Sequence, residues 1–171
     1  MQWIRRGAAW VYGDHIVGDD LIGGPEAINN DVYDPEILAK LLMQGVDPDF
    51  VARARPGDFV VAGRNLGYSK MHQQVYLALR GFGIGGIVAE SFQPFLRRAF
   101  PTYAIPFTRC PNVTQRVETG HQLHIDFLKG EIFNETSGQL IRGERMPEVL
   151  VPYYEAGEHL TYLKRKLRQA E

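Results

Sequence analysis

The side chains best suited to chemistry in this sequence gather in one stretch, residues 63–74, which reads GRNLGYSKMHQQ. Within it, Ser69, Lys70 and His72 supply a hydroxyl, an amine and an imidazole. A mostly apolar run at residues 58–62 predicts a buried strand just before it, and the residues after it predict a helix. A loop from strand to helix gathers backbone N–H groups at the positive end of the helix dipole, where a carboxylate or phosphate can bind. Gly63 and Gly67 of this loop also fit a plain turn, which needs glycine only for its backbone conformation.

The elements that would position this stretch form a mixed α/β pattern. The strand before it, the helix after it and a second apolar run at residues 87–90 make a βαβ unit, whose two strands we expect to be parallel. Residues 8–12 predict a first strand, and Asp34 followed by proline predicts a helix start. Residues 16–31 contain glycines, aspartates and a proline, and we expect them to be irregular and exposed.

The last third of the chain changes character. Alternation over residues 123–128, followed by a Lys-Gly turn, predicts antiparallel hairpins. A final helix carries leucines at positions 160, 163 and 167 on one face. His121 and His124 are three apart in a predicted strand, so they face opposite sides and make a poor metal pair.

Composition bounds the class of protein. A chain of 171 residues is long enough for one solid core, and we expect residues 1–171 to form a single domain. The net charge of −1 argues against a general nucleic-acid binder, and no apolar run approaches the roughly 20 residues of a membrane span. The start of the chain lacks a signal-peptide core, which predicts a cytoplasmic protein. Cys110 is the one cysteine and cannot hold an iron–sulfur cluster alone, so we expect no metal site in this chain.

Several short motifs, in order along the chain, point to one family. Residues 13–22 echo the pattern GDNVDTDxII, residues 47–67 match DPDF…PGDIIVAGxNFG, and residues 83–92 match GIxAVIAESF. Later patterns at residues 130–138 and 160–163 fit as well. Single pieces are weak, but their order and spacing together are specific. Almost end to end, the chain resembles the small subunit of 3-isopropylmalate dehydratase, which is similar to the swivelling fourth domain of aconitases.

The resemblance implies a fold, a partner and a reaction. The family fold is a compact three-layer β/β/α swivelling domain, here with a parallel βαβ unit and a β-rich C-terminal part. It caps a separate large subunit that carries a [4Fe–4S] cluster on three cysteines, and the open iron binds the substrate as a Lewis acid. The small subunit grips a carboxylate and removes a proton. The implied reaction is the reversible dehydration of a 2-hydroxy di- or tricarboxylic acid, or of an unusual related hydroxy acid.

The departures from the family pattern lie at its centre. The family sequence continues with GSSREH, and an ungapped alignment places those letters on residues 69–74. The family glycine becomes Ser69, its catalytic serine becomes Lys70 and its carboxylate-binding arginine becomes His72.

Outside the central loop, two further positions of the family's site motifs keep the family residue. Asp19 is retained from the early motif, and Arg98 is retained from a later one, where Ala99 then replaces an asparagine of the family. Together with the frame of the central loop, these positions give the expected substrate-binding residues: Arg64, Asn65, Gly67, His72, Asp19 and Arg98.

Two main hypotheses follow. In the first, the site remains catalytic with changed residues. Lys70 acts as the base if burial or cations such as Arg64 lower its pKa, or Ser69, one position earlier, takes the place of the family's catalytic serine. His72 then binds a carboxylate when protonated or donates as a neutral ring, and the substrate is unusual. In the second, the chain is a catalytically silent lid or scaffold, or a small-molecule-binding domain. A standalone phosphate-binding module is a third option, although the spacing is wrong for a P-loop. The family motifs on both sides of the loop are intact, which favours the first hypothesis, an active enzyme with a changed site.

Overall fold

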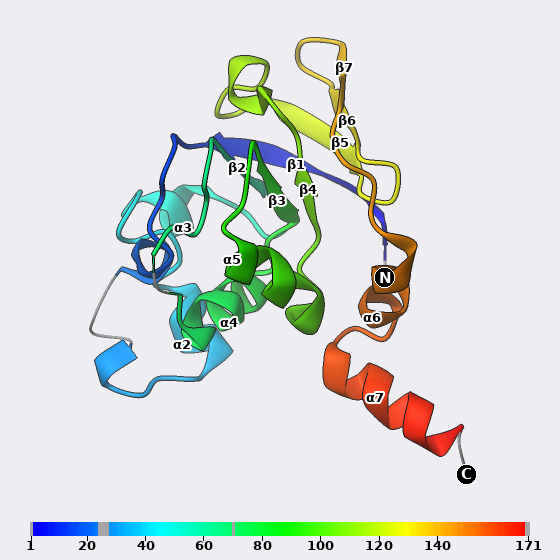
Figure 1. Ribbon diagram of the computed structural model, residues 1–171. Helices are drawn as coiled ribbons and strands as arrows, with labels where there is room; N and C mark the ends of the chain where they lie inside the picture. The colour runs from blue at the N-terminus through cyan, green and yellow to red at the C-terminus, as the bar shows by residue number, and fades with distance from the viewer. Residues whose placement is uncertain (1, 24–27, 70, 170–171) are drawn as a thin grey trace.

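The computed structural model describes residues 2–23, 28–69 and 71–169, and Lys70, the predicted base, lies outside these ranges. Its framework is a seven-stranded sheet with the order β4-β3-β2-β1-β5-β6-β7 (Figure 1). The strands are β1 (Ile4–Val11), β2 (Phe59–Ala62), β3 (Gly86–Ala89), β4 (Phe107–Arg109), β5 (Gln122–Asp126), β6 (Glu131–Asn134) and β7 (Gln139–Arg142). Strands β1 to β4 pair in parallel, whereas β1, β5, β6 and β7 pair antiparallel, so β1 joins a parallel half to an antiparallel half.

Short helices connect the strands, and three further helical segments follow the last strand. The α-helices are α2 (Pro35–Ala39), α3 (Phe50–Arg53), α4 (Gln73–Phe82), α5 (Pro94–Ala99), α6 (Val151–Glu155) and α7 (His159–Arg168). The 3-10 segments are η1 (Asp19–Ile22), η2 (Phe100–Tyr103), η3 (Val113–Gln115) and η4 (Glu148–Leu150). The predicted helix start at Asp34 is confirmed, because its carboxylate accepts a hydrogen bond from the backbone N–H of Glu36 and caps α2.

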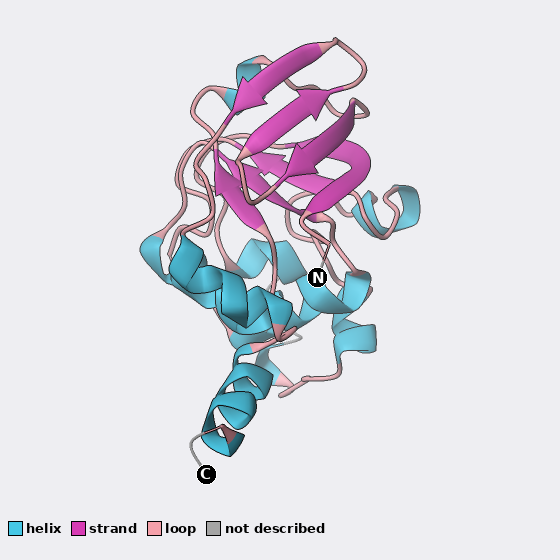
Figure 2. Cartoon of the chain, turned by 90° about the vertical axis from the view of Figure 1, so that its right-hand side faces the viewer, coloured by secondary structure: helices cyan, strands magenta, loops and turns pink. Residues whose placement is uncertain are grey.

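Two hydrophobic cores lie on the two faces of the parallel half. Successive side chains of a strand point to opposite faces, so Val60 of β2 joins the core beneath the helices while Val61 joins the other core. That second core is closed by the antiparallel half, for example by Ile125 and Ile132. Helices, parallel half and antiparallel half therefore stack as the expected β/β/α arrangement, and Figure 2 shows most of the helices gathered below the strands.

The βαβ unit around the central loop is confirmed. Val60 of β2 and Ile87 of β3 are partners in a parallel register. Helix α4 joins the two strands and is capped by Gly83, whose left-handed backbone lets its N–H donate to the carbonyls of Leu79 and Arg80. The loop of residues 63–72 is consequently anchored at one end by a buried strand and at the other by a packed helix.

Some expectations from the sequence need correction. Strand β1 begins at Ile4 rather than at residue 8. Residues 16–22 are not exposed as predicted, because η1 turns Leu21 and Ile22 inward until only 2% and 1% of their surface remains accessible. Gly23 and residues 29–31 are exposed as predicted, and residues 24–27 of the same segment lie outside the described ranges. The backbone N–H of Met43, which is distant in the sequence, donates to the carbonyl of Leu21 at 2.6 Å and holds this segment in place. The predicted leucine face of α7 is present but exposed, with the three side chains 41% to 69% accessible.

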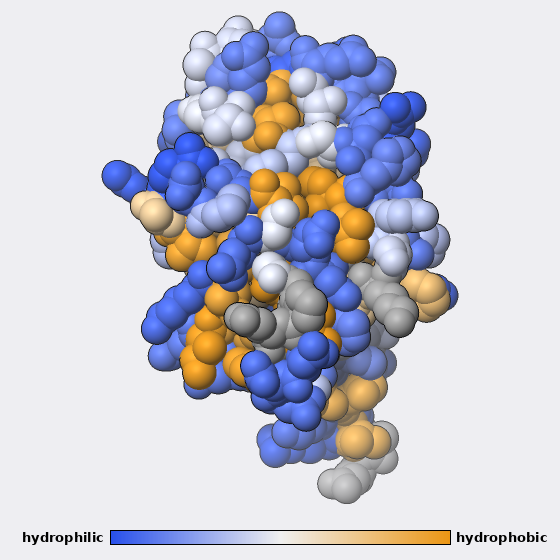
Figure 3. Space-filling view, turned by 90° about the vertical axis from the view of Figure 1, so that its left-hand side faces the viewer, coloured by the Kyte–Doolittle hydropathy of each residue, from blue (hydrophilic) through white to orange (hydrophobic). Residues whose placement is uncertain are grey.

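The molecular surface is mixed. Figure 3 shows one face, on which apolar patches lie between polar and charged side chains. Within the described ranges, no helix combines the length and apolar character that crossing a membrane requires.

Candidate active site at the loop between β2 and α4

Three segments that leave the carboxyl ends of parallel strands lie side by side. Residues 13–22 follow β1, residues 63–72 follow β2, and residues 90–93 follow β3. A parallel bridge joins Val17 to Tyr68, and a second bridge joins the central segment to the one after β3. In open parallel sheets, this edge is where ligands usually bind. The predicted site residues in these segments are therefore brought to one place.

Asp19 and His72 meet there although 53 positions separate them in the sequence. His72 is the N-cap of α4, and Asp19 opens η1. Nδ1 of His72 lies 2.9 Å from Oδ1 of Asp19, and the two side chains are 41% and 21% exposed. With a proton on Nδ1, the ring donates to the carboxylate and keeps Nε2 for another partner. Asp19 therefore fixes the orientation of the imidazole.

Arg64 forms an ion pair with Asp14. Its backbone N–H donates to Oδ1 at 2.7 Å, while Nε and Nη2 donate to Oδ2 at 2.9 and 2.6 Å. These hydrogen bonds, the backbone one foremost, hold the pKa of Asp14 below its usual value, and the same carboxylate raises the pKa of Arg64. Because the pair carries no net charge, Arg64 is a weaker source of positive potential for a nearby base than the sequence suggested.

Left-handed backbone conformations concentrate in and beside this loop. His15, Asn65 and Ser69 have φ angles of 58°, 60° and 66°, a conformation that costs a non-glycine residue about 1–2 kcal/mol. The surroundings hold Asn65 in place, because its N–H donates to Oγ of Ser91 at 2.8 Å and its Nδ2 lies 3.3 Å from Nδ1 of His15. At position 69 the family pattern has glycine, a residue that adopts this left-handed conformation freely.

Gly67 is expected to be essential for the packing of the loop. Its φ is 82°, and an added Cβ would lie 2.7 Å from Cδ2 of Leu96 in α5. Strain and overpacking together predict that Gly67→Ala lowers the free energy of unfolding by about 2–4 kcal/mol, measurable by urea denaturation. Gly138→Ala is a matched control, since Gly138 has a φ of 73° but no atom within 4 Å of an added Cβ. Its expected loss is about 1–2 kcal/mol. Equal losses in the two variants would contradict the close approach of Gly67 to Leu96.

A hollow of about 500 Å³ opens beside Ser69 and His72. Its lining comes from the loop, from α4 and from α5 with the residue before it: Ser69, Met71, His72, Tyr76, Gln93, Phe95 and Ala99. The guanidinium of Arg98 lies 4.9 Å from the ring centroid of Phe95, next to the hollow. The site thus combines a hydroxyl, an oriented imidazole and a largely apolar wall.

The structure gathers most of the predicted site residues but adds others. Those that lie in the three adjoining segments are Asp19, Arg64, Asn65, Gly67, Ser69 and His72. Arg98 lies in α5 instead, where its guanidinium packs over the ring of Phe95. Sequence reasoning missed the apolar lining, because apolar residues at helical spacing are typical of core packing and carry no separate signal for a binding wall.

No protein-family model matches the chain. The isopropylmalate/citramalate isomerase small subunit of Methanocaldococcus jannaschii is 32% identical over 171 residues, which is 100% of both proteins. The 3-isopropylmalate dehydratase small subunit of Pyrobaculum calidifontis is 34% identical over 161 residues, covering 94% of this chain and 98% of the relative. The chain belongs to the 3-isopropylmalate dehydratase small-subunit family. A crystal structure of 3-isopropylmalate dehydratase from M. jannaschii agrees, with a TM-score of 0.88 at 30% identity and 98% coverage of both chains.

Family membership confirms the class predicted from the motifs. The chain is a hydro-lyase subunit of the aconitase superfamily, and the comparisons support this hypothesis rather than the silent lid. The three-layer fold expected from the resemblance is confirmed by the same structural match.

The family is of the iron–sulfur, aconitase type, and this chain offers little to hold such a cluster. In the part of the chain that the structure describes, no group of three or more His, Cys, Asp or Glu side chains could hold a metal ion. The thiol of Cys110 is fully buried, and burial raises its pKa to about 11. A buried thiol of this kind is a poor source of the thiolate that iron requires.

Cys110 is therefore expected to resist alkylation in the folded chain at mildly alkaline pH. Its burial keeps the reagent away, and the raised pKa of the thiol leaves little thiolate to react. Mass spectrometry after iodoacetamide treatment measures the modified fraction. A guanidinium-denatured sample, treated in parallel, should be modified completely. Rapid modification of the folded chain would disprove the burial.

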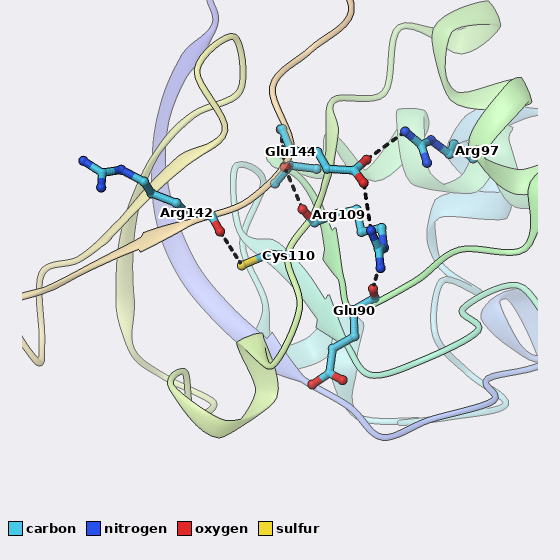
Figure 4. Close-up of polar contacts among 7 residues, drawn as sticks. Glu90, Arg97, Arg109, Cys110, Arg142 and Glu144 are labelled. Carbon is cyan, nitrogen blue, oxygen red and sulfur yellow. Dashed lines mark hydrogen bonds and ion pairs between the residues drawn. The ribbon is translucent and has the colours of Figure 1, made fainter.

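A separate polar group of residues has a structural role (Figure 4). The carboxylate of Glu144 accepts hydrogen bonds from Arg97 at 2.8 Å and from Arg109 at 2.9 Å. Nε of Arg109 also donates to the carbonyl of Glu90 at 3.1 Å, while the carboxylate of Glu90 accepts from Thr114. This group ties the C-terminal segment to α5 and to the edge strand β4.

Proposed function

We propose that this chain completes the active site of a two-subunit hydro-lyase, opposite a larger partner that holds a [4Fe–4S] cluster, and that the enzyme acts on a 2-hydroxy acid. The observation that carries the proposal is the Asp19–His72 pair beside a hollow at the edge of the parallel half. Membership of the family supports the reaction class and the need for a large subunit. When bound to the partner, the cluster supplies a Lewis acid for the substrate hydroxyl.

The reaction removes water across two neighbouring carbons. The bond from one carbon to its hydroxyl breaks, the other carbon gives a proton to a base, and a carbon–carbon double bond forms; hydration reverses these changes. The carboxylate beside the acidic C–H takes up negative charge as the proton leaves. A side chain on this carboxylate would act mainly on the transition state, whereas a side chain on the other carboxylate binds substrate and transition state alike.

His72 is placed to hold a substrate carboxylate. Asp19 occupies its Nδ1 at 2.9 Å, which leaves Nε2 for the substrate. The arginine of the family pattern offers two parallel hydrogen bonds in a rigid fork, whereas an imidazole offers one from this edge. We infer that the grip on a dicarboxylate is weaker and that substrates of another shape are tolerated.

Two residues compete for the role of the base. Lys70 stands at the position of the family's catalytic serine, and because it lies outside the described residues its assignment rests on the sequence. Ser69 lines the hollow beside His72, and its left-handed backbone is the conformation expected of the family's glycine. Sequence position favours Lys70, and Ser69 is the alternative that mutagenesis must separate from it.

We further propose that residues 1–171 act as one domain in the cytoplasm, with neither nucleic acid nor membrane as a partner. The nearly neutral net charge of −1 supports the first of these exclusions, because nucleic-acid binders usually carry a basic excess.

Affinity capture of the tagged chain from its native host under anaerobic conditions tests the proposal. We expect a larger protein to copurify with iron and sulfide, in amounts stoichiometric with the complex. The complex should also convert hydroxy acids such as malate into unsaturated acids, seen as a rise in ultraviolet absorbance. An untagged strain controls for adventitious capture. A chain recovered alone and free of iron would contradict the proposed partner.

A further inference from the structure

The hollow beside His72 has a lining of two kinds. Ser69 and His72 bring polar groups from the loop, and most of the remaining lining is apolar or aromatic: Met71, Tyr76, Phe95 and Ala99. Gln93 also lines the hollow, but its side-chain oxygen already accepts a hydrogen bond from the backbone N–H of Phe95 at 2.7 Å. The part of the lining that α5 contributes is consequently apolar.

Phe95 and Ala99 share one face of α5, because they are four residues apart. Phe95 is 66% exposed, and the guanidinium of Arg98 lies 4.9 Å from its ring centroid, where it helps to hold the ring in position. An ordered aromatic ring that stays exposed beside a hollow gains stabilisation when an apolar group covers it.

The size of the hollow admits more than a short hydroxy acid. Its volume is about 500 Å³, whereas an apolar cavity of about 150 Å³ is enough to bind benzene. Ala99 also stands where the family pattern has asparagine. Alanine there shortens the side chain and removes a polar group, which both enlarges the hollow and makes it more apolar.

We propose that the surface formed by Met71, Phe95 and Ala99, here called the α5 wall, receives an aromatic ring carried by the substrate. The substituent that bears the ring is attached to the carbon next to the one that carries the hydroxyl, and His72 holds one of the carboxylates. This inference rests on the proposed function and names its substrate class: 2-hydroxy dicarboxylic acids with an aryl or arylalkyl substituent.

A series of substituted malates tests the α5 wall in the complete complex with its large subunit. The members are malate, 3-methylmalate, 3-isopropylmalate and 3-benzylmalate, and the quantity measured is kcat/KM for dehydration. We expect 3-benzylmalate to exceed both malate and 3-isopropylmalate by at least about 10-fold, because even one methylene in an apolar pocket changes kcat/KM by roughly 10-fold or more.

Two variants and a control connect this preference to the wall. Ala99→Leu fills the hollow, and Phe95→Ala removes the aromatic ring of the α5 wall. Each should lower the ratio of kcat/KM for 3-benzylmalate to that for malate by about 10-fold or more. Ala52→Leu makes the same change as the first variant at an exposed position of α3, and should leave the ratio unchanged. Thermal unfolding of each complex establishes that it is folded.

The outcomes separate this inference from the function on which it rests. Turnover of malate with no preference for 3-benzylmalate, or a preference that neither wall variant lowers, would overturn the α5 wall while leaving the hydro-lyase intact. Absence of turnover with every member of the series would overturn the proposed function and this inference with it. A preference for 3-benzylmalate that both wall variants lower and the control preserves would establish the wall.

Discussion

The His72→Ala variant of the assembled enzyme is expected to raise KM by about 10- to 100-fold while kcat changes much less. The physical reason is the loss of a hydrogen bond to a substrate carboxylate, and a hydrogen bond to a charged group contributes about 1.5–3 kcal/mol. Steady-state kinetics over a wide range of substrate concentration measure both constants. A raised KM with little change in kcat is the signature of an interaction made equally with substrate and transition state.

Two further variants separate binding by His72 from its orientation by Asp19. Asp19→Asn keeps the size of the side chain but removes the charge that faces Nδ1 at 2.9 Å, so KM should rise by a smaller factor than in His72→Ala. His72→Arg restores the forked donor of the family pattern and should lower KM for dicarboxylates. If His72→Ala instead lowered kcat and left KM unchanged, His72 would act on the transition state alone and its assignment as a binding residue would be wrong.

Lys70→Ala is expected to reduce kcat by at least about 100-fold, because positioned proton transfer contributes roughly 10²- to 10⁴-fold to such reactions. Assembly with the large subunit should persist, since the change removes a side chain without altering the strand and helix that anchor the loop. Turnover measurements on the copurified complex test both statements. Full activity in this variant would remove Lys70 from the mechanism.

Ser69→Gly examines the competing assignment. Position 69 has a φ of 66°, so glycine relieves strain there and the loop should be no less stable than before. Any loss of kcat in this variant would therefore report the missing hydroxyl and not a damaged loop. A loss as large as the one predicted for Lys70→Ala, combined with an active Lys70→Ala variant, would identify Ser69 as the base.

Periodicity predicted the parts of the fold that depend on local pattern. The apolar run of residues 59–62 is a fully buried strand, and the alternation around Ile125 forms antiparallel pairs. The early segment was predicted incorrectly because its structure depends on a distant contact. Leu21 is buried by η1 and by the hydrogen bond from Met43, and nothing within residues 16–23 signals that partner.

In the candidate site, too, the sequence predicted which residues take part but not the contacts between residues that are distant in the sequence. Comparison of motifs placed Asp19 and His72 in the site separately, and only the structure reveals that one orients the other across 53 positions. The sequence suggested Arg64 as a cation that lowers the pKa of a nearby base, but its carboxylate partner Asp14 lies in another loop and pairs with it. The wall at Phe95 was missed because an apolar residue early in a short helix resembles core, although this ring is 66% exposed.

Reconstitution of activity from separate subunits tests the central claim most directly. The large subunit and this chain are purified anaerobically, and dehydration of 2-hydroxy acids is measured for each alone and for the mixture. We predict that neither subunit turns over substrate alone, that the mixture does, and that a mixture with His72→Ala requires a much higher substrate concentration. Equal turnover by the large subunit with and without this chain would contradict the claim that the chain completes the active site.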